Sequence, residues 1–290
     1  MPRVAKIRAL LNDSGGNVLD LRLASEFEFG HFPGAVPHPL SGAPTPEALE
    51  EELPSIFLPP REEPLLVVAD SVETASAVAT HLESRGRAPV TSLVLNSSDW
   101  ADLPESMRET GTSMAHLWAP PRWLTDHADL LPPPAAGPVL DLACGSGRAA
   151  VWLAERGYRV TGVDWQAEAL DLGRRLAASR GTACDFFAAD LRDPKAAPRG
   201  PWSVVLNFRF LERDLLKGLA IMTGSGGVVM LRTFREAPGY QGHPRPRFRL
   251  RPWELTSAFP RGVWEILAHE QGFDPDGRPA AGIVARKRGA

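Results

Sequence analysis

Residues 141–148 (DLACGSGR) decide the fold that this sequence predicts. A mostly apolar run, residues 139–142, leads into two glycines, Gly145 and Gly147, and an alanine-rich stretch follows them. Glycine permits positive φ and a close approach of the backbone to a ligand. A helix that starts after such a loop directs free N–H groups toward that ligand. The next apolar run ends at Asp164, whose carboxylate can accept hydrogen bonds from two ribose hydroxyls. Together these features predict a strand–loop–helix–strand unit that binds a nucleoside cofactor.

Short apolar runs and stretches of helical periodicity alternate along the rest of the chain. Such alternation is typical of an α/β protein with a parallel sheet covered on both faces. In the second half we expect strands at 139–143, 159–164, 183–188, 203–208 and 227–234, and helices at 147–156, 167–179 and 213–222. In the first half we expect strands at 17–21, 65–69 and 92–95, and a helix at 74–85. Ligands of such sheets bind beyond the carboxyl ends of the strands.

Two classes of cofactor fit the glycine loop. The spacing Gly145-x-Gly147-x-x-Ala150 satisfies the dinucleotide-binding pattern, so NAD is one candidate. Asp141, however, lies near the end of the first strand, where a carboxylate attracts an ammonium group and repels a pyrophosphate. S-adenosylmethionine carries that ammonium group and no phosphate. Asp190, at the end of the third strand, offers an acceptor for an adenine amino group. The charges therefore favour S-adenosylmethionine.

Residues 138–290 resemble the class I S-adenosylmethionine-dependent methyltransferases. The resemblance covers residues 141–147, the acids Asp164 and Asp190, and residues 204–207 (VVLN). In the usual family pattern a glycine stands at the position of Ala143. The family implies a Rossmann-like domain with a mostly parallel, seven-stranded sheet.

Three further segments resemble small bacterial methyltransferases of the tellurite-resistance type. They are residues 207–213 (NFRFLER), residues 248–255 (FRLRPWEL) and a leader at 117–120 (LWAP). This subgroup resemblance does not fix the substrate. By analogy it suggests a thiol or chalcogen species as the methyl acceptor.

The resemblance implies direct SN2 transfer of a methyl group, in which positioning can contribute about 7–11 kcal/mol. No covalent protein intermediate is required, so we assign no catalytic residue. The residues that the motifs assign to the cofactor are Asp141, Ala143, Cys144, Gly145, Gly147, Asp164, Trp165, Asp190, Leu191 and Asn207. Two alternatives stay open: an NAD-dependent oxidoreductase, and a non-catalytic protein that binds S-adenosylmethionine.

Between residues 232 and 251 the sequence holds six arginines and one acid, Glu236. Interspersed prolines predict an ordered loop here. The arginines form either a solvated surface or a lid that holds an anionic acceptor, and both interpretations stay open. RNA contact is less favoured, because few aromatic residues lie between the arginines. In the lid interpretation the residues that contact the acceptor are Arg209, Arg213, His243, Arg247 and Arg249.

The N-terminal half resembles a rhodanese-type sulfurtransferase domain. The resemblance covers residues 18–35, 66–70, 75–86 and 93–100. Such domains carry sulfur on a cysteine at the end of a central strand, with an arginine five residues later. This sequence has Asp70 and Ala75 at those positions, and a carboxylate cannot carry a persulfide. We therefore expect an inactive module that serves as a scaffold, a homodimer contact or a docking surface. Arg22 and His31 are interpreted as structural.

Composition and charge set the domain organisation. The chain has 290 residues, of which 43% are hydrophobic and 23% charged, so it has room for two domains. We expect a rhodanese-like domain at 1–108, a proline-rich connector with a leader helix at 109–137, and a methyltransferase domain at 138–290. The first 110 residues hold 17 acidic and 8 basic side chains, whereas the remainder hold 18 and 24. This sign change supports two domains, and neither charge is basic enough to predict nucleic-acid binding.

Other classes of protein are excluded by what the sequence lacks. Two cysteines, Cys144 and Cys184, are too few for a disulfide framework, and the scattered histidines lack the spacing of metal ligands. No apolar run approaches the roughly 20 residues of a membrane span. The first residues carry charge but no following apolar stretch with a cleavage site, so we expect no secretory signal. We therefore expect a cytoplasmic enzyme with a small-molecule acceptor, no metal and no membrane partner.

Overall fold

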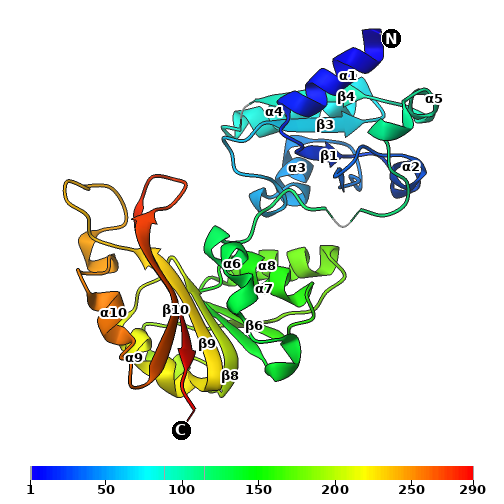
Figure 1. Cartoon of the computed structure of the whole chain (residues 1–290). Helices are drawn as coiled ribbons and strands as arrows, with labels where there is room; N and C mark the ends of the chain where they lie inside the picture. The colour runs from blue at the N-terminus through cyan, green and yellow to red at the C-terminus, as the bar shows by residue number, and fades with distance from the viewer. Residues whose placement is uncertain (1, 88, 114, 290) are drawn as a thin grey trace. The chain divides into compact units, whose positions relative to one another are not determined.

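The computed structural model describes residues 2–87, 89–113 and 115–289, and the chain divides into two compact units, Met1–Ala119 and Pro120–Ala290 (Figure 1). Each unit has its own sheet and its own hydrophobic core. Among the described residues, none of the helices combines the length and the apolar character that a membrane span requires.

The first unit is built on a parallel sheet in the order β2-β1-β3-β4. Its strands are β1 (Val18–Asp20), β2 (Val36–Pro37), β3 (Leu65–Ala69) and β4 (Val90–Val94). Its helices are α1 (Pro2–Asp13), α2 (Ala24–Phe29), α3 (Pro46–Glu52), α4 (Val72–Ser84) and α5 (Ser97–Ala101), with 3-10 turns η1 (Ser55–Phe57) and η2 (Glu105–Met107). Strand β3 is buried throughout, and its alternate side chains enter two different core clusters. Both faces of this sheet are therefore covered, as the continuous apolar run predicts.

Polar side chains at the end of β1 hold the first unit together. Arg22 donates from Nη2 to Asp20 Oδ2 at 2.6 Å, and its guanidinium lies 4.3 Å from the centre of the Trp100 ring. His31 stacks on Phe27 with ring centres 3.9 Å apart, and both of these residues are buried. A buried charge such as that of Arg22 needs partners of this kind, and the stacked His31 ring packs beside Phe27, so both side chains stabilise this unit.

The second unit contains a seven-stranded sheet in the order β10-β11-β9-β8-β5-β6-β7. Its strands are β5 (Val139–Leu142), β6 (Val160–Asp164), β7 (Asp185–Ala188), β8 (Trp202–Phe208), β9 (Thr223–Phe234), β10 (Trp264–Phe273) and β11 (Pro279–Lys287). Strand β11 runs antiparallel to both of its neighbours, and the other pairs are parallel. The predicted fold class, two α/β domains of which the second has a mostly parallel, seven-stranded sheet, is confirmed.

Helices cover both faces of this second sheet (Figure 1). The helices are α6 (Arg122–Asp126), α7 (Arg148–Ala154), α8 (Ala167–Ser179), α9 (Arg213–Met222) and α10 (Glu254–Ala258), and the 3-10 turns are η3 (Ala128–Leu130), η4 (Pro134–Ala136), η5 (Pro194–Ala196) and η6 (Pro246–Phe248). Helix α9 buries Leu215 and Leu219, which are one turn apart, against the sheet. These leucines join a core cluster that also contains Leu140, Val205 and Ile283 from three of the strands.

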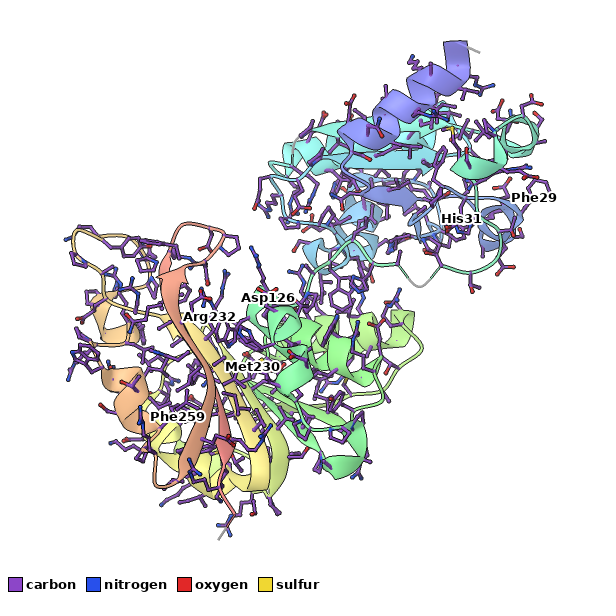
Figure 2. The ribbon with its side chains drawn as sticks, viewed as in Figure 1. Phe29, His31, Asp126, Met230, Arg232 and Phe259 are labelled. Atoms are coloured by element: carbon purple, nitrogen blue, oxygen red, sulfur yellow. The ribbon has the colours of Figure 1, made fainter. Side chains whose placement is uncertain are left out.

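Helix α6 packs on the second sheet, so residues from Pro120 onward belong to the C-terminal unit. A Cβ atom built on Gly282 of β11 would lie only 2.7 Å from the indole of Trp123. The guanidinium of Arg232 on β9, a residue labelled in Figure 2, lies 5.1 Å from the centre of the same indole ring. The leader helix therefore covers the sheet directly, and Gly282 is a position where only glycine leaves room for it.

Candidate cofactor site

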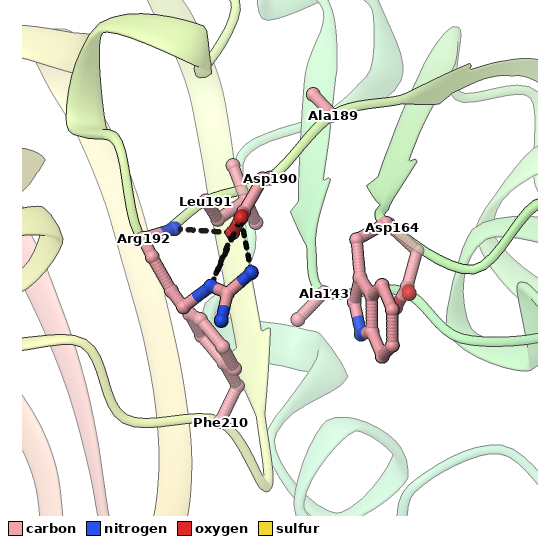
Figure 3. A pocket seen from close by; sticks show the side chains of 8 residues that line it. Ala143, Asp164, Ala189, Asp190, Leu191, Arg192 and Phe210 are labelled. Atoms are coloured by element: carbon pink, nitrogen blue, oxygen red, sulfur yellow. Dashed lines mark hydrogen bonds and ion pairs between the residues drawn. The ribbon is translucent and has the colours of Figure 1, made fainter.

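A cavity of about 320 Å³ lies at the carboxyl ends of β5, β6 and β7 (Figure 3). Of the ten residues predicted to bind the cofactor, five line it: Ala143, Asp164, Trp165, Asp190 and Leu191. Ala189, Arg192 and Phe210 complete the lining, and sequence reasoning did not assign them. The other five do not line the cavity: Asp141 lies on β5, Asn207 on the neighbouring strand β8, and Cys144, Gly145 and Gly147 in the glycine loop.

Asp164 links the glycine loop to the tip of β6. Its Oδ2 accepts a hydrogen bond of 2.8 Å from the Gly145 backbone N–H, and its Oδ1 accepts one of 3.0 Å from Gln166 N–H. Each carboxylate oxygen has a second acceptor position, so Asp164 can also serve a ligand hydroxyl. A Cβ atom on Gly145 would meet no heavy atom within 4 Å. The loop is therefore braced from one side and open above Gly145.

Gly147 packs tightly against an aromatic ring from β7. Its φ is +71°, and a Cβ atom there would lie 2.6 Å from Cζ of Phe186. Gly162 and Gly173 face the same ring, with built Cβ atoms at 2.7 and 3.0 Å. Three glycines from a loop, a strand and a helix thus form one cradle for Phe186. This contact fixes the end of the glycine loop against β6 and α8.

Ala143 occupies the position of the first glycine of the family pattern and has φ of +54°. An L-residue in the left-handed region carries a strain of about 1–2 kcal/mol. The backbone therefore keeps the conformation that favours glycine, although the side chain has changed. The departure from the family pattern costs stability without altering the course of the loop.

Asp141 is a buried acid without a charged partner. Only 2% of the residue is exposed, and its Oδ2 has no hydrogen-bond partner among the described residues. Burial and the nearby Asp164 carboxyl raise the pKa of Asp141 to about 8, although the Ala150 backbone N–H donates a hydrogen bond to it. Burying a carboxyl oxygen without a hydrogen-bond partner lowers the stability of the folded protein, which indicates that Asp141 has a functional role. A cationic ligand group at the loop would supply the missing partner.

Asn207 and Cys144 are also partly or fully enclosed near the loop. Asn207 at the end of β8 is 3% exposed, and its Oδ1 has no hydrogen-bond partner among the described residues. Burial, followed by the carboxyls of Asp141 and Asp164, raises the pKa of the Cys144 thiol well above its usual range. Cys144 therefore stays a protonated thiol and contributes packing.

Asp190 is held by an arginine on the same loop (Figure 3). Arg192 donates from Nε to both carboxylate oxygens at 2.9 Å and from Nη2 to Oδ2 at 2.5 Å. These hydrogen bonds lower the pKa of Asp190 to about 2. The acid predicted to accept the adenine amino group is thus ionised and oriented by Arg192, whose planar guanidinium forms part of the cavity wall.

The five residues predicted to contact an acceptor lie outside the cavity lining. Arg213 donates from Nε to Glu254 Oε1 at 2.6 Å and from Nη1 to the Arg247 carbonyl at 2.8 Å. Arg249 donates to the carbonyls of Pro244, Tyr240 and Gly242. Both guanidinium groups therefore anchor the arginine-rich loop and have protein partners in place of an anion.

Arg209, His243 and Arg247 differ from these two loop anchors. Arg209 has φ of +58° and pairs with Asp274 and Asp276 at 3.2 and 2.9 Å. His243 and Arg247 are exposed, and the Arg247 guanidinium lies 4.6 Å from the centre of the Phe248 ring. The structure thus separates the predicted acceptor residues into loop anchors, an ion-pair network and exposed loop side chains.

We expect Arg213→Ala to destabilise the second unit by about 2 kcal/mol, because it removes the guanidinium that donates to Glu254 and to two backbone carbonyls. Urea unfolding measures this loss. Lys217→Ala on the same helix is the control, since the pair of Lys217 with Asp214 is exposed and should contribute under about 1 kcal/mol. In a double-mutant cycle with Glu254→Ala the losses should be non-additive. Additive losses would contradict the anchoring role.

Comparison with known families supports both halves of the chain. A family model described as "Methyltransferase domain" matches residues 139–223, and one described as "Rhodanese-like domain" matches residues 4–102. The two matched regions lie in the order that the sequence predicted, a rhodanese-like region followed by a methyltransferase region.

Individual relatives cover the chain to different extents. An uncharacterized protein of Schizosaccharomyces pombe is 25% identical over 93% of both chains. A ubiquinone biosynthesis O-methyltransferase of Vibrio parahaemolyticus is 31% identical over 100 residues, which is 33% of this chain and 43% of that protein. Among solved structures, TehB from Haemophilus influenzae is 21% identical with a TM-score of 0.49, and covers 57% of this chain and 61% of its own. The match to the ubiquinone enzyme therefore spans less than half of that protein's length.

Proposed function

We propose that the second unit binds S-adenosylmethionine at the glycine loop and in the adjoining cavity at β5, β6 and β7, and transfers its methyl group to a small acceptor. The observation that carries this proposal is the buried Oδ2 of Asp141, which lacks a partner among the described residues. An ammonium group satisfies that oxygen, whereas a pyrophosphate would be repelled by it. The structure therefore favours an adenosyl amino acid over a dinucleotide.

The residues around the loop fit the parts of such a ligand. Asp141 would hold the amino group, and Asp164 would accept from ribose hydroxyls with its remaining lone pairs. Trp165, which is 66% exposed, and buried Leu191 would contact the adenine ring, with Asp190 beside them. No heavy atom lies within 4 Å of a Cβ atom built on Gly145, so the ligand can contact the loop backbone there.

The bound cofactor would supply an electrophilic methyl group for direct SN2 displacement. The chain's own contribution is to bind, orient and exclude water, and such positioning can account for about 7–11 kcal/mol of the barrier. Helix α6 contacts β9 and β11 through Trp123, and the anchored loop, residues 235–253, follows the carboxyl end of β9. No covalent step on the protein is needed.

We propose that the acceptor is a small thiol or chalcogen species. The two segments that resemble the tellurite-resistance type, residues 207–213 and 248–255, contact each other through Arg213 and Glu254. This contact supports a shared structural role for both segments. An anionic acceptor held by Arg213 and Arg249 is less favoured, because their donors already serve protein oxygens. A screen of thiols, selenite, tellurite and small carboxylic acids with labelled methyl donor tests the assignment.

Calorimetric titration of the full chain with S-adenosylmethionine and with NAD tests the proposed cofactor. Binding of the former alone, together with label transfer in the acceptor screen, is the expected result. Binding of NAD alone would overturn the proposal in favour of an oxidoreductase. Binding of S-adenosylmethionine without transfer to any acceptor would favour a non-catalytic binding protein.

We also propose that the rhodanese-like unit is catalytically inactive. Helix α4 begins two residues after Asp70, and Ser71 caps it by accepting from Thr74 N–H at 3.1 Å. No loop remains there to direct several backbone N–H groups at a sulfur atom. We propose that this unit serves as a scaffold, a homodimer contact or a docking surface for a partner, in a cytoplasmic protein.

Sulfurtransferase assays with thiosulfate and cyanide should therefore give no turnover with the full chain. The physical reason is that both cysteines, Cys144 and Cys184, lie in the second unit, so the first has no thiolate. A Cys144→Ser/Cys184→Ser variant is the control for adventitious thiol chemistry. Turnover that persists in this variant would contradict the expectation.

A further inference from the structure

A second cavity, of about 140 Å³, lies in the first unit between α3, η1 and the end of α4. Its charged lining consists of Arg61, Arg85, Arg87, His81 and Glu50. Asp70 precedes α4, whereas Arg85 follows it, so this cavity lies at the opposite end of the helix from the sulfur position of a rhodanese. A ligand bound in this cavity would therefore not contact Asp70, the position that carries sulfur in a rhodanese.

The three arginines of this cavity are held in different ways. Arg87 is 3% exposed and donates from Nη1 to the carbonyls of Pro59 and Pro60 at 2.8 and 2.9 Å. It thereby fixes the turn that carries Arg61. Arg61 itself is exposed and makes no hydrogen bond or ion pair with any described residue. A guanidinium in this position has all its donors available to a ligand.

Glu50 is the single acid in the cavity lining, and it neutralises part of this charge. Its carboxylate pairs with Arg85 Nη1 and lies 4.0 Å from Nε2 of His81. Glu50 is 54% exposed at its side chain, so it can move into solvent. The C-terminus of α4 adds about half a negative charge, which three guanidinium groups outweigh. The site keeps a positive excess that one mobile carboxylate only partly offsets.

We propose that this cavity binds a small oxyanion, with phosphate or sulfate as the minimal ligand, which displaces Glu50 from Arg85 and also contacts Arg61. Guanidinium groups match the oxygens of such anions in planar, two-point hydrogen bonds. A water molecule occupies about 30 Å³ in the liquid, so the cavity has room for a tetrahedral anion with ordered water. The ligand is either a free ion or the phosphate of a small phosphomonoester.

Calorimetric and thermal-shift titrations of the full chain with sodium phosphate, sodium sulfate and methyl phosphate test the proposal. Ionic strength is held constant with chloride, because screening alone changes charged surfaces. Arg61→Ala should weaken binding about tenfold or more, and Glu50→Gln should tighten it about threefold or more, because the competing carboxylate is gone. Whichever of the free ions or methyl phosphate binds tightest identifies the source of the oxyanion.

Arg8→Ala supplies the matched control, since Arg8 is an exposed arginine on α1 of the same unit. It should leave the affinity for phosphate unchanged. Circular dichroism verifies that each variant is folded. The proposal is overturned if chloride stabilises the chain as much as phosphate does, or if Arg61→Ala and Arg8→Ala have equal effects.

Discussion

Asp141→Asn is expected to weaken S-adenosylmethionine binding by about 100-fold or more and, at pH 8, to stabilise the ligand-free protein. The affinity falls because the buried carboxylate, which is 2% exposed, loses its charge. Removing one partner of a buried charged pair costs about 2–5 kcal/mol. Calorimetric titration measures the affinity. Asp185→Asn, a change of an exposed acid at the start of β7, is the control and should alter neither property.

The stability change follows from the pKa of Asp141, which is raised from 3.8 to about 8. Between these values the folded protein holds a proton that the unfolded chain has lost, so stability falls as pH rises through this window. The asparagine variant lacks this titration. Its gain in melting temperature should be largest at pH 8 and above, and absent below pH 4. Each kcal/mol corresponds to about 2–4 °C for a domain of this size.

The same titration predicts how cofactor affinity depends on pH. Below pH 8 a cation must displace the proton from Asp141, so affinity should rise about tenfold per pH unit from pH 6 toward pH 8. Calorimetry in buffers of different ionisation enthalpy should detect the released proton. This rise in affinity between pH 6 and pH 8 should be absent in Asp141→Asn. The same pH dependence of affinity in the variant would mean that another titrating group controls binding.

Gly147→Ala is expected to destabilise the second unit by about 3 kcal/mol and to abolish cofactor binding. Its φ of +71° disfavours an L-residue by about 1–2 kcal/mol. The new methyl group would also lie 2.6 Å from Cζ of Phe186, and a contact this close forces the loop or the ring to move. Urea unfolding and calorimetric titration measure the two effects.

Gly181→Ala separates the two causes. Gly181 has φ of +60°, but a Cβ atom there meets nothing within 4 Å, so this variant reports backbone strain alone. The difference between the two variants is the steric cost of the Phe186 contact. Phe186→Leu should recover part of the loss in the Gly147→Ala background. Equal losses for both alanine variants, without any recovery by Phe186→Leu, would contradict the claim that packing against Phe186 fixes the glycine loop.

Elements with strong periodicity could be predicted from the sequence closely. The bounds of β3, α8 and α9 agree with the residues expected for them, because their apolar positions follow a single period. Strand β10 was missed, since an exposed edge strand with residues such as Glu265 and Glu270 has no apolar alternation. Strand β11 was missed because it begins at a proline and is rich in alanine, and its two neighbouring strands stabilise it.

The site could be predicted only as far as local motifs reach. Asp164, Trp165 and Asp190 line one cavity as expected, because parallel strands bring their carboxyl ends to one edge. The pair of Arg213 with Glu254 joins residues 41 positions apart and depends on tertiary packing. Arg192 carried a weak signal, since it follows Asp190 by two positions and a turn brings such neighbours together.

Arg249 has a consequence for the energetics of any ligand that meets the loop around it. A single guanidinium holds three backbone carbonyls, those of Tyr240, Gly242 and Pro244, and lies over the Tyr240 ring. The conformational entropy of this segment is therefore lost when the chain folds, before a ligand arrives. A ligand that binds against this loop therefore needs little further ordering of the loop, and the loop selects ligands by the shape that it already has in the free protein.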